Sequence, residues 1–280
     1  TKEKVRLEVS APREIERGVR QLLANKVSGT LVGIWLLVPE YLRLGAWDFL
    51  KTWSGMPDER VEPRLALQLI NESALCVSGI RMQRTLSQKG FELANGLPFI
   101  ATDSAIHHVL DSHSVAEAQR VQIALGKMRQ TFDHFKGKTI IIDPHRIKSS
   151  SKRQMIRRQK DQDSRPAKMA QTFFSLDAET KQPLCFTTAS SARTSTQATP
   201  ELLSLVSSIL KPNGSRPLVL ADNEHYSLEL FEWISSRSCF DLLVPMPYNS
   251  LVRRAMGRLP SEAFTRHWAG YATAKQSYAM

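Results

Sequence analysis

Residues 137–146 read GKTIIIDPHR. The run Thr139–Ile142 is apolar or β-branched throughout, which favours a strand buried on both faces. The run stops at a single carboxylate, Asp143, and Pro144 follows at once. We therefore expect Asp143 to lie at the carboxyl end of a buried strand.

A second stretch, Pro217–Tyr226, repeats this design as PLVLADNEHY. Its apolar run stops at Asp222. Either aspartate alone is most simply a turn residue at a strand end. Two buried strands that each deliver one aspartate at the carboxyl end instead suggest a carboxylate site for two metal ions.

The elements between and around these stretches predict a mixed α/β sheet. We expect strands over 139–142, 170–176 and 183–188, a helix from Thr199-Pro200-Glu201, a strand over 218–221, a helix capped by Ser227, and a strand over 240–244. The order βββαβαβ is that of the ribonuclease H-like fold. In that fold the fourth strand lies parallel to the first and beside it, so both aspartates leave adjacent strands, ~4.8 Å apart, at one end of the sheet.

Paired carboxylates at this spacing repel each other unless a cation lies between them. Hard oxygen ligands of this kind suit Mg²⁺ or Mn²⁺. Two such ions ~3.5–4 Å apart can activate the attacking oxygen and stabilise the leaving oxygen of a phosphoryl transfer. Asp143 and Asp222 are therefore the candidate catalytic and metal-binding residues.

Residues 1–136 are expected to form an all-α domain that binds DNA. Residues 80–113 have the pattern of a helix, a glycine-containing turn and a second helix, as in a helix-turn-helix that enters the major groove. Thr102 or Asp103 would cap the second helix, with Ala105, Ile106, Val109 and Leu110 on its inner face. His107 and His108 would then face DNA, although any two helices joined by a glycine turn share this pattern.

The charge of the chain favours a polyanionic partner. Its 38 Lys and Arg against 27 Asp and Glu give a net charge of +11, as is typical of nucleic-acid-binding proteins. A basic but otherwise ordinary enzyme is the alternative. Cationic residues concentrate directly after Asp143, where they could neutralise a phosphate backbone or form a solvated loop. The DNA-binding candidates among them are Arg146, Lys148, Lys152, Arg153, Arg157 and Arg158.

Other features exclude some classes of protein. The three cysteines lack CxxC spacing, which argues against a zinc site and against a disulfide framework. The longest apolar run, Leu31–Val38, is far short of the ~20 residues that a transmembrane helix needs. No signal peptide is visible. We expect no membrane association and a cytoplasmic, nucleoid-associated location of prokaryotic type.

Residues 137–248 resemble the catalytic core of DDE transposases of the insertion-sequence IS4-like superfamily. The resemblance lies in IIIDPHRI around Asp143, in the strand PLCFTTAS, and above all in VLADNEHYSLELFEWISSRSCFDLLVPMP. It implies that Asp143 and Asp222 are the first two of three catalytic acids, with Mg²⁺ or Mn²⁺ as cofactor. It also implies cleavage and strand transfer on double-stranded DNA, at transposon ends and a target, by a homodimer.

The sequence departs from this family at two places. Asn223-Glu224-His225-Tyr226 replaces the usual turn, so Glu224 is either an unusual metal ligand or a solvent-facing acid. The third acid, expected on a later helix within a Tyr, Arg, Glu, Lys series, is not found, and Glu262 lacks matching neighbours. Residues 251–280 resemble the start of a β-rich insertion after a core over 137–250. We therefore expect the chain to stop before its third acid.

Two other functions stay open from the sequence. A catalytically inactive remnant could bind transposon ends through the helical domain and the basic segment. Another ribonuclease H-like nuclease, such as a structure-specific junction resolvase, would cut branched DNA without terminal repeats.

Overall fold

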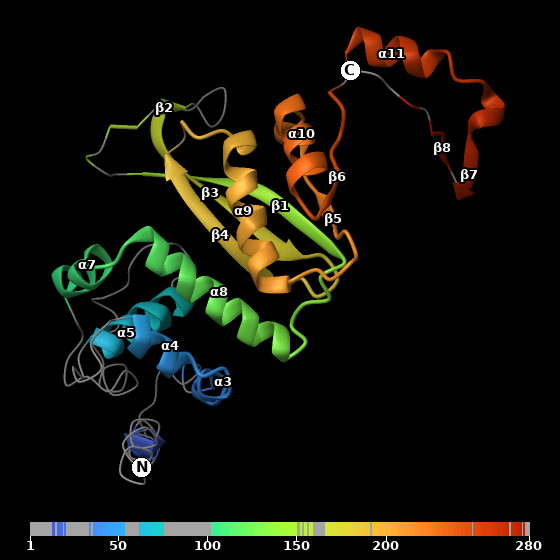
Figure 1. The fold of residues 1–280 in the computed structure, drawn as a ribbon. Coiled ribbons are helices and arrows are strands. Elements are labelled where there is room, and N and C mark those ends of the chain that lie inside the picture. The colour runs from blue at the N-terminus through green and yellow to red at the C-terminus, as the bar shows by residue number, and fades with distance from the viewer. Residues whose placement is uncertain are drawn as a thin grey trace. The chain divides into compact units, whose positions relative to one another are not determined.

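The computed structural model describes residues 13–14, 16–18, 20, 34, 36–53, 62–75, 102–149, 152, 154–155, 157–158, 166–190, 192–247, 249–268, 270–275 and 277. The chain divides into two compact units. The first comprises Thr1–Lys136 with Ser204–Lys211, and the second comprises Gly137–Leu203 with Pro212–Met280. Figure 1 labels the helices and strands of both units.

The first unit is helical. Its helices are α3 (Val38–Arg43), α4 (Ala46–Trp53), α5 (Glu62–Leu75), α7 (Asp103–Asp111) and α8 (Val115–Thr131). Pro39 lies in the first turn of α3, where its missing N–H is tolerated. The break between α3 and α4 falls at Gly45, whose φ of +60° favours glycine. Ser114 and Glu117 form a capping box that starts α8.

Small clusters of apolar side chains hold this unit together. Leu50, Ala66 and Leu67 form one buried cluster, against which Tyr41 packs. The Tyr41 hydroxyl donates a hydrogen bond of 3.0 Å to Asn71 on α5. A second close contact lies at Gly126 of α8. A Cβ atom added there would lie 2.7 Å from Ile209 Cδ1, so only glycine leaves room for the isoleucine.

The predicted recognition helix exists as α7. Thr102 is its N-cap and accepts a hydrogen bond from the Ala105 N–H, and Ile106 and Val109 are buried as expected. Leu110 was expected to face inward, but 42% of its surface is exposed, and the buried cluster on α7 consists of Ile106 and Val109, against which Ala105 and Leu69 pack. The first helix of the predicted helix-turn-helix lies outside the described residues, so the motif itself stays a prediction.

The second unit contains a mixed sheet. Its strands are β1 (Thr139–Lys148), β2 (Arg157–Arg158), β3 (Ala167–Asp177), β4 (Pro183–Ser190), β5 (Leu218–Leu220) and β6 (Asp241–Leu243). The strand order is β2-β3-β1-β5-β6, with β4 also paired to β3. β3 runs antiparallel to both β1 and β4, whereas β5 runs parallel to both β1 and β6.

The predicted end of the first strand is wrong. β1 continues through Asp143 and Pro144 to Lys148, so Asp143 lies in the middle of a strand of 10 residues. The parallel pairing with β5 ends at Ile141, while the antiparallel pairing with β3 continues to Lys148. Beyond Ile141 the β5 side of β1 is therefore an edge, where a proline is tolerated because no N–H is needed.

The predicted start of the next helix is also wrong. α9 runs from Ser195 to Leu210, and Pro200 lies inside it. Thr194 Oγ1 accepts a hydrogen bond from the Gln197 N–H, and Gln197 Oε1 accepts one from the Thr194 N–H. This reciprocal cap starts the helix before Thr199, so Pro200 falls near the end of the second turn, where its lack of an N–H removes one intrahelical hydrogen bond.

The predicted hairpin between β3 and β4 is confirmed. Asp177 is fully buried where β3 ends. Its carboxylate accepts hydrogen bonds from the N–H groups of Gly137, Glu179 and Thr180 and from the Thr180 hydroxyl. One buried side chain thereby fixes both the turn and the entry of the chain into β1.

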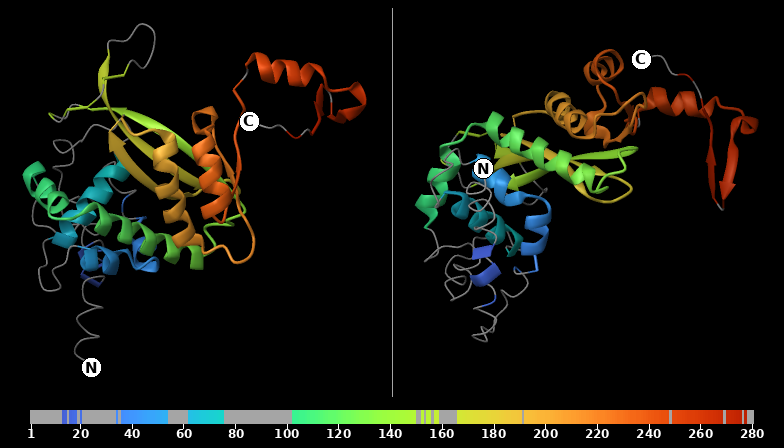
Figure 2. Two further views of the ribbon diagram at one scale, coloured as in Figure 1. Left: turned by 45° about the horizontal axis from the view of Figure 1, so that its top comes forward. Right: turned by 60° about the horizontal axis from the view of Figure 1, so that its bottom comes forward.

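Two helices lie over one face of the sheet, α9 and α10 (Leu228–Arg237), as Figures 1 and 2 show. Ser227 caps α10 as predicted, and Leu230 and Ile234 are its buried residues. Beyond β6 follow α11 (Ser250–Gly257), the short 3₁₀ helix η2 (Ser261–Ala263) and the hairpin β7 (Thr265–Trp268)–β8 (Tyr271–Thr273). None of the described helices has the length and apolarity that crossing a bilayer requires.

Candidate active site

The sheet places Asp143 and Asp222 side by side. The last parallel pair joins Ile141 of β1 to Leu220 of β5. Each aspartate lies two residues after this pair, so both reach the same level of the sheet on neighbouring strands. Adjacent strands lie about 4.8 Å apart. The two carboxylates predicted from separate stretches therefore lie close together in the structure.

The electrostatics of Asp143 reflect this arrangement. Partial burial, and then the negative charges of Asp222 and Glu224, raise the pKa of Asp143, while His225 and His145 act in the opposite direction. None of the described residues donates a hydrogen bond to the Asp143 carboxylate. The ionised form of Asp143 is thus disfavoured in the folded chain and would be stabilised by a cation.

Asp222 is held in place by the turn that follows it. It is the N-cap of the 3₁₀ helix η1 (Asn223–His225), and its Oδ1 accepts a hydrogen bond of 3.1 Å from the Glu224 N–H. His225 Nδ1 lies 2.8 Å from the same Oδ1. Because an ionised carboxylate only accepts, this contact places a proton on Nδ1. The His225 side chain is almost fully buried and fixes the orientation of Asp222.

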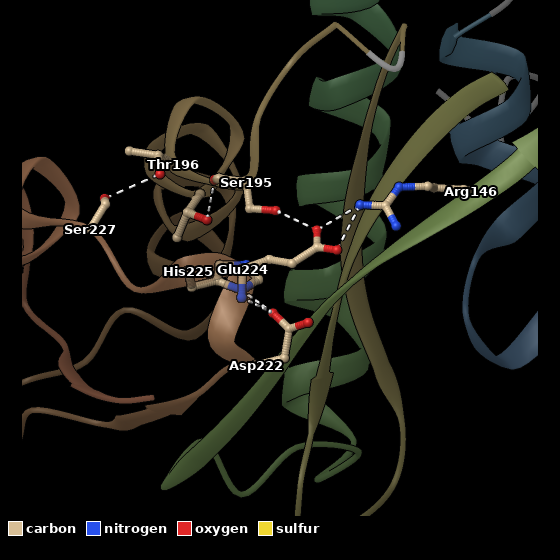
Figure 3. A network of polar contacts seen from close by, with 8 residues as sticks. Arg146, Ser195, Thr196, Asp222, Glu224, His225 and Ser227 are labelled. Carbon is tan, nitrogen blue, oxygen red and sulfur yellow. Dashed lines mark hydrogen bonds and ion pairs between the residues drawn. The ribbon is translucent and has the colours of Figure 1, made fainter. Parts of the chain in front are cut away.

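The carboxylate of Glu224 points toward Arg146 (Figure 3). Arg146 Nη2 lies 2.7 Å from Glu224 Oε1 and 2.8 Å from Oε2. The Ser195 hydroxyl, at the start of α9, lies 3.5 Å from Oε2. This ion pair ties β1 to the turn after β5. It also means that Arg146, predicted to bind DNA, is paired with a carboxylate of its own chain in this structure.

A further contact joins the two helices that start beside the site. Thr196 Oγ1 of α9 lies 3.1 Å from Ser227 Oγ, the N-cap of α10 (Figure 3). Ser227 Oγ also accepts a hydrogen bond from the Leu230 N–H. The turn that carries Asp222, Glu224 and His225 is therefore held between two helix starts.

The donor set fits a hard divalent cation. Both described contacts of Asp222 use Oδ1, which leaves Oδ2 for a metal ion, and Asp143 offers a carboxylate crowded by like charges. Oxygen ligands of this kind match Mg²⁺ or Mn²⁺. Within the described ranges, no group of three or more His, Cys, Asp or Glu side chains is arranged to hold a metal. Glu224 is close to the pair, but its carboxylate is engaged by Arg146.

The predicted DNA-binding residues fall into separate places. Lys148 and Lys152 are exposed at and beyond the end of β1, in the second unit. The backbone of Arg157 and Arg158 forms β2, which pairs with β3, while Arg153 lies outside the described residues. His107 and His108 are exposed on α7, in the first unit.

The sequence interpretation missed His225. The residue stands three positions after Asp222, and the 3₁₀ turn brings its ring back onto the carboxylate. Its signal was present in the sequence as Asp-Asn-Glu-His, an acid followed at i+3 by a histidine. That spacing is informative only once a turn at this position is known.

Comparison with known proteins gave distant structural neighbours. No family model matches the chain, and no curated protein matches its sequence. One neighbour is the piggyBac transposase in a synaptic complex with hairpin DNA, with 13% identity and a TM-score of 0.35 over 79% of this chain and 44% of that one. Another is the Mos1 mariner transposase in a paired-end complex with Mn, with 13% identity and a TM-score of 0.27 over 92% of this chain and 84% of that one. The chain thus spans less than half the length of the piggyBac protein.

Proposed function

We propose that this chain is the metal-dependent catalytic region of a DNA transposase of the DDE type with a ribonuclease H-like core. The observation that carries the proposal is that Asp143 of β1 and Asp222, which follows β5, each lie two residues beyond the last pair of these adjacent parallel strands. The resemblance of residues 137–248 to IS4-like transposases supports the same reaction. The substrate would be double-stranded DNA, and the two ends would be held by a homodimer.

In this proposal Asp143 and Asp222 hold Mg²⁺ or Mn²⁺. The bound ions would supply activation of the attacking oxygen and stabilisation of the leaving oxygen in phosphoryl transfer. His225 keeps Asp222 oriented through Oδ1. Partial burial and the like charges of Asp222 and Glu224 raise the pKa of Asp143, and a bound cation would offset both effects. Lys148 and Lys152 would contact the phosphate backbone.

One observation favours a second candidate function. The described residues hold two convergent aspartates but no three-ligand group. A chain of this kind could bind DNA as a catalytically inactive remnant of a transposase. The two functions differ in whether DNA is cut, since both require binding.

Cleavage of DNA in the presence of metal tests the proposal. We expect the wild type to nick a labelled duplex in Mg²⁺ or Mn²⁺ and not in EDTA. The Asp143→Asn and Asp222→Asn variants should lose cleavage and keep DNA binding. Asp241→Asn is the matched control, because Asp241 lies on β6 in an ion pair with Arg216, and it should still cut.

Two results would contradict the transposase proposal. DNA binding without cleavage in either metal would favour the inactive remnant. Cleavage restricted to branched junctions would favour a junction resolvase. A panel of linear, nicked and four-way substrates separates these outcomes.

A further inference from the structure

The neighbouring strands β4, β3 and β1 each place one side chain in a row on the face of the sheet opposite α9. Cys185 and Thr187 of β4 contact α9, since Cys185 Sγ lies 3.9 Å from the Leu202 carbonyl oxygen and Thr187 Oγ1 lies 2.8 Å from Glu201 Oε1. Side chains alternate along a strand, so Phe186 points to the opposite face.

The strand register extends this row across the sheet. Phe186 pairs with Phe174 of β3, and Phe174 pairs with Asp143 of β1. Directly paired residues lie on the same face with Cβ atoms about 5 Å apart. Asp143, Phe174 and Phe186 therefore form a line that begins at the candidate metal site.

The rings of Phe174 and Phe186 contact each other and are partly open to solvent, and the ring of His145, two residues after Asp143 on β1, lies beside Phe174. The centroids of Phe174 and Phe186 are 5.8 Å apart, and that of His145 is 6.5 Å from Phe174. Phe174 is 38% exposed and Phe186 is 43% exposed. Large exposed apolar side chains gathered at one place mark a binding surface more often than scattered ones do.

The size of this surface argues against a protein partner. A phenylalanine side chain buries about 200 Å², so two rings that are roughly 40% exposed offer about 160 Å². A stable protein interface needs about 800 Å² on each partner. The exposed rings are sufficient for one or two flat ligands.

The charge of the sequence that follows Asp143 favours nucleic acid. Residues 146–168 contain nine Lys and Arg against two Asp. β1 runs from Asp143 into this segment, and Lys168 lies on β3 six residues before Phe174, on the same face by alternation. A polyanion bound here would bring its bases to the aromatic row.

We propose that Phe174 and Phe186 form a stacking platform for an unpaired nucleobase of DNA that is bound beside Asp143. Bases inside a duplex cover one another, whereas an unpaired base exposes its ring. Aromatic side chains on a sheet bind such bases without needing a particular sequence. This inference rests on the proposed function, because it takes DNA bound at the Asp143–Asp222 site as its reference point.

Binding in EDTA tests the platform without requiring cleavage. The probes are fluorescent duplexes with a two-nucleotide single-stranded end, carrying either thymines or abasic residues of equal charge. We expect the wild type to bind the thymine end about tenfold more tightly, within the range for stacking one or two bases. The Phe174→Leu/Phe186→Leu variant should lose this preference and keep the abasic affinity. Phe264→Leu, which removes a phenylalanine of similar exposure, is the control.

Several outcomes would overturn the inference. Equal wild-type affinity for thymine and abasic ends would exclude base stacking. If the double variant binds both probes more weakly by the same factor, the rings serve folding and not base stacking. If its sedimentation mass changes while its DNA affinity does not, the rings form an interface between copies of the chain. Circular dichroism and the melting temperature report whether the variant is folded. Failure of cleavage with the thymine preference intact would contradict the proposed function alone.

Discussion

Asp143 occupies a position in which its ionised form is disfavoured. Its pKa is raised by burial and by the charges of Asp222 and Glu224. The pKa of Asp143 is therefore higher in the folded chain than in the unfolded chain. Its contribution to the free energy of unfolding is fully present below the unfolded pKa and is lost as the pH rises through the folded pKa. At neutral pH the charge on Asp143 therefore opposes folding.

The Asp143→Asn substitution should raise the melting temperature at pH 7 in EDTA, because it removes this charge. The difference from wild type should shrink as the pH falls and Asp143 takes up its proton. Saturating Mn²⁺ should raise the melting temperature of the wild type more than that of the variant. Thermal unfolding followed by circular dichroism from pH 4 to 8 measures these effects. Asp241→Asn, which breaks the ion pair with Arg216, should not stabilise the chain.

Only some residues of the candidate site could be predicted from the sequence. Asp143 and Asp222 stand out because each follows an apolar run. His225 and the Arg146–Glu224 pair do not, because both depend on where a 3₁₀ turn directs its side chains. Sequence spacing indicates which residues share a strand or helix, and it says little about a turn of three residues.

At the scale of elements, α8 and the end of α9 meet without space for a side chain at Gly126. A Cβ atom there would lie 2.7 Å from Ile209 Cγ1 and Cδ1 and 3.0 Å from Cγ2. Ile209 is 2% exposed and has little freedom to move. Overpacking of this kind outweighs the gain of about 1 kcal/mol in helix propensity.

The Gly126→Ala variant should be destabilised by about 1 kcal/mol in urea unfolding. In an Ile209→Ala background the same substitution should instead stabilise by about 1 kcal/mol, because the obstructing atoms are gone. Gly257→Ala in α11 is the control, since a Cβ atom there meets no atom within 4 Å. Equal effects of Gly126→Ala in both backgrounds would contradict the close contact.

Strand and helix types were predictable, whereas several boundaries were not. β1 is longer than its apolar run because β3 continues to pair with the polar residues after Asp143. α9 begins before Thr199-Pro200 because Thr194 and Gln197 already cap it. In both cases the boundary of the element is set by a partner strand or a capping residue that lies outside the apolar pattern. The local composition of the segment therefore does not predict that boundary.

At the scale of the whole molecule, the charge of +11 should appear as salt-dependent DNA binding. Each phosphate contact contributes about 0.9 to the slope of log affinity against log salt. The Lys148→Ala/Lys152→Ala variant should therefore lower the slope by about 2 in fluorescence anisotropy with duplex DNA. Arg237→Ala, at the exposed end of α10, should leave it unchanged. An unaltered slope in the lysine variant would place the phosphate contacts elsewhere.

If Asp143 and Asp222 form one divalent-cation site, a calorimetric titration with Mn²⁺ should detect it. The wild type should bind Mn²⁺, and Asp143→Asn and Asp222→Asn should each abolish saturable binding. His225→Leu should weaken binding by about tenfold, since it frees the orientation of Asp222. Asp241→Asn should bind as the wild type does. Absence of binding by the wild type, or equal binding by wild type and both aspartate variants, would contradict the claim.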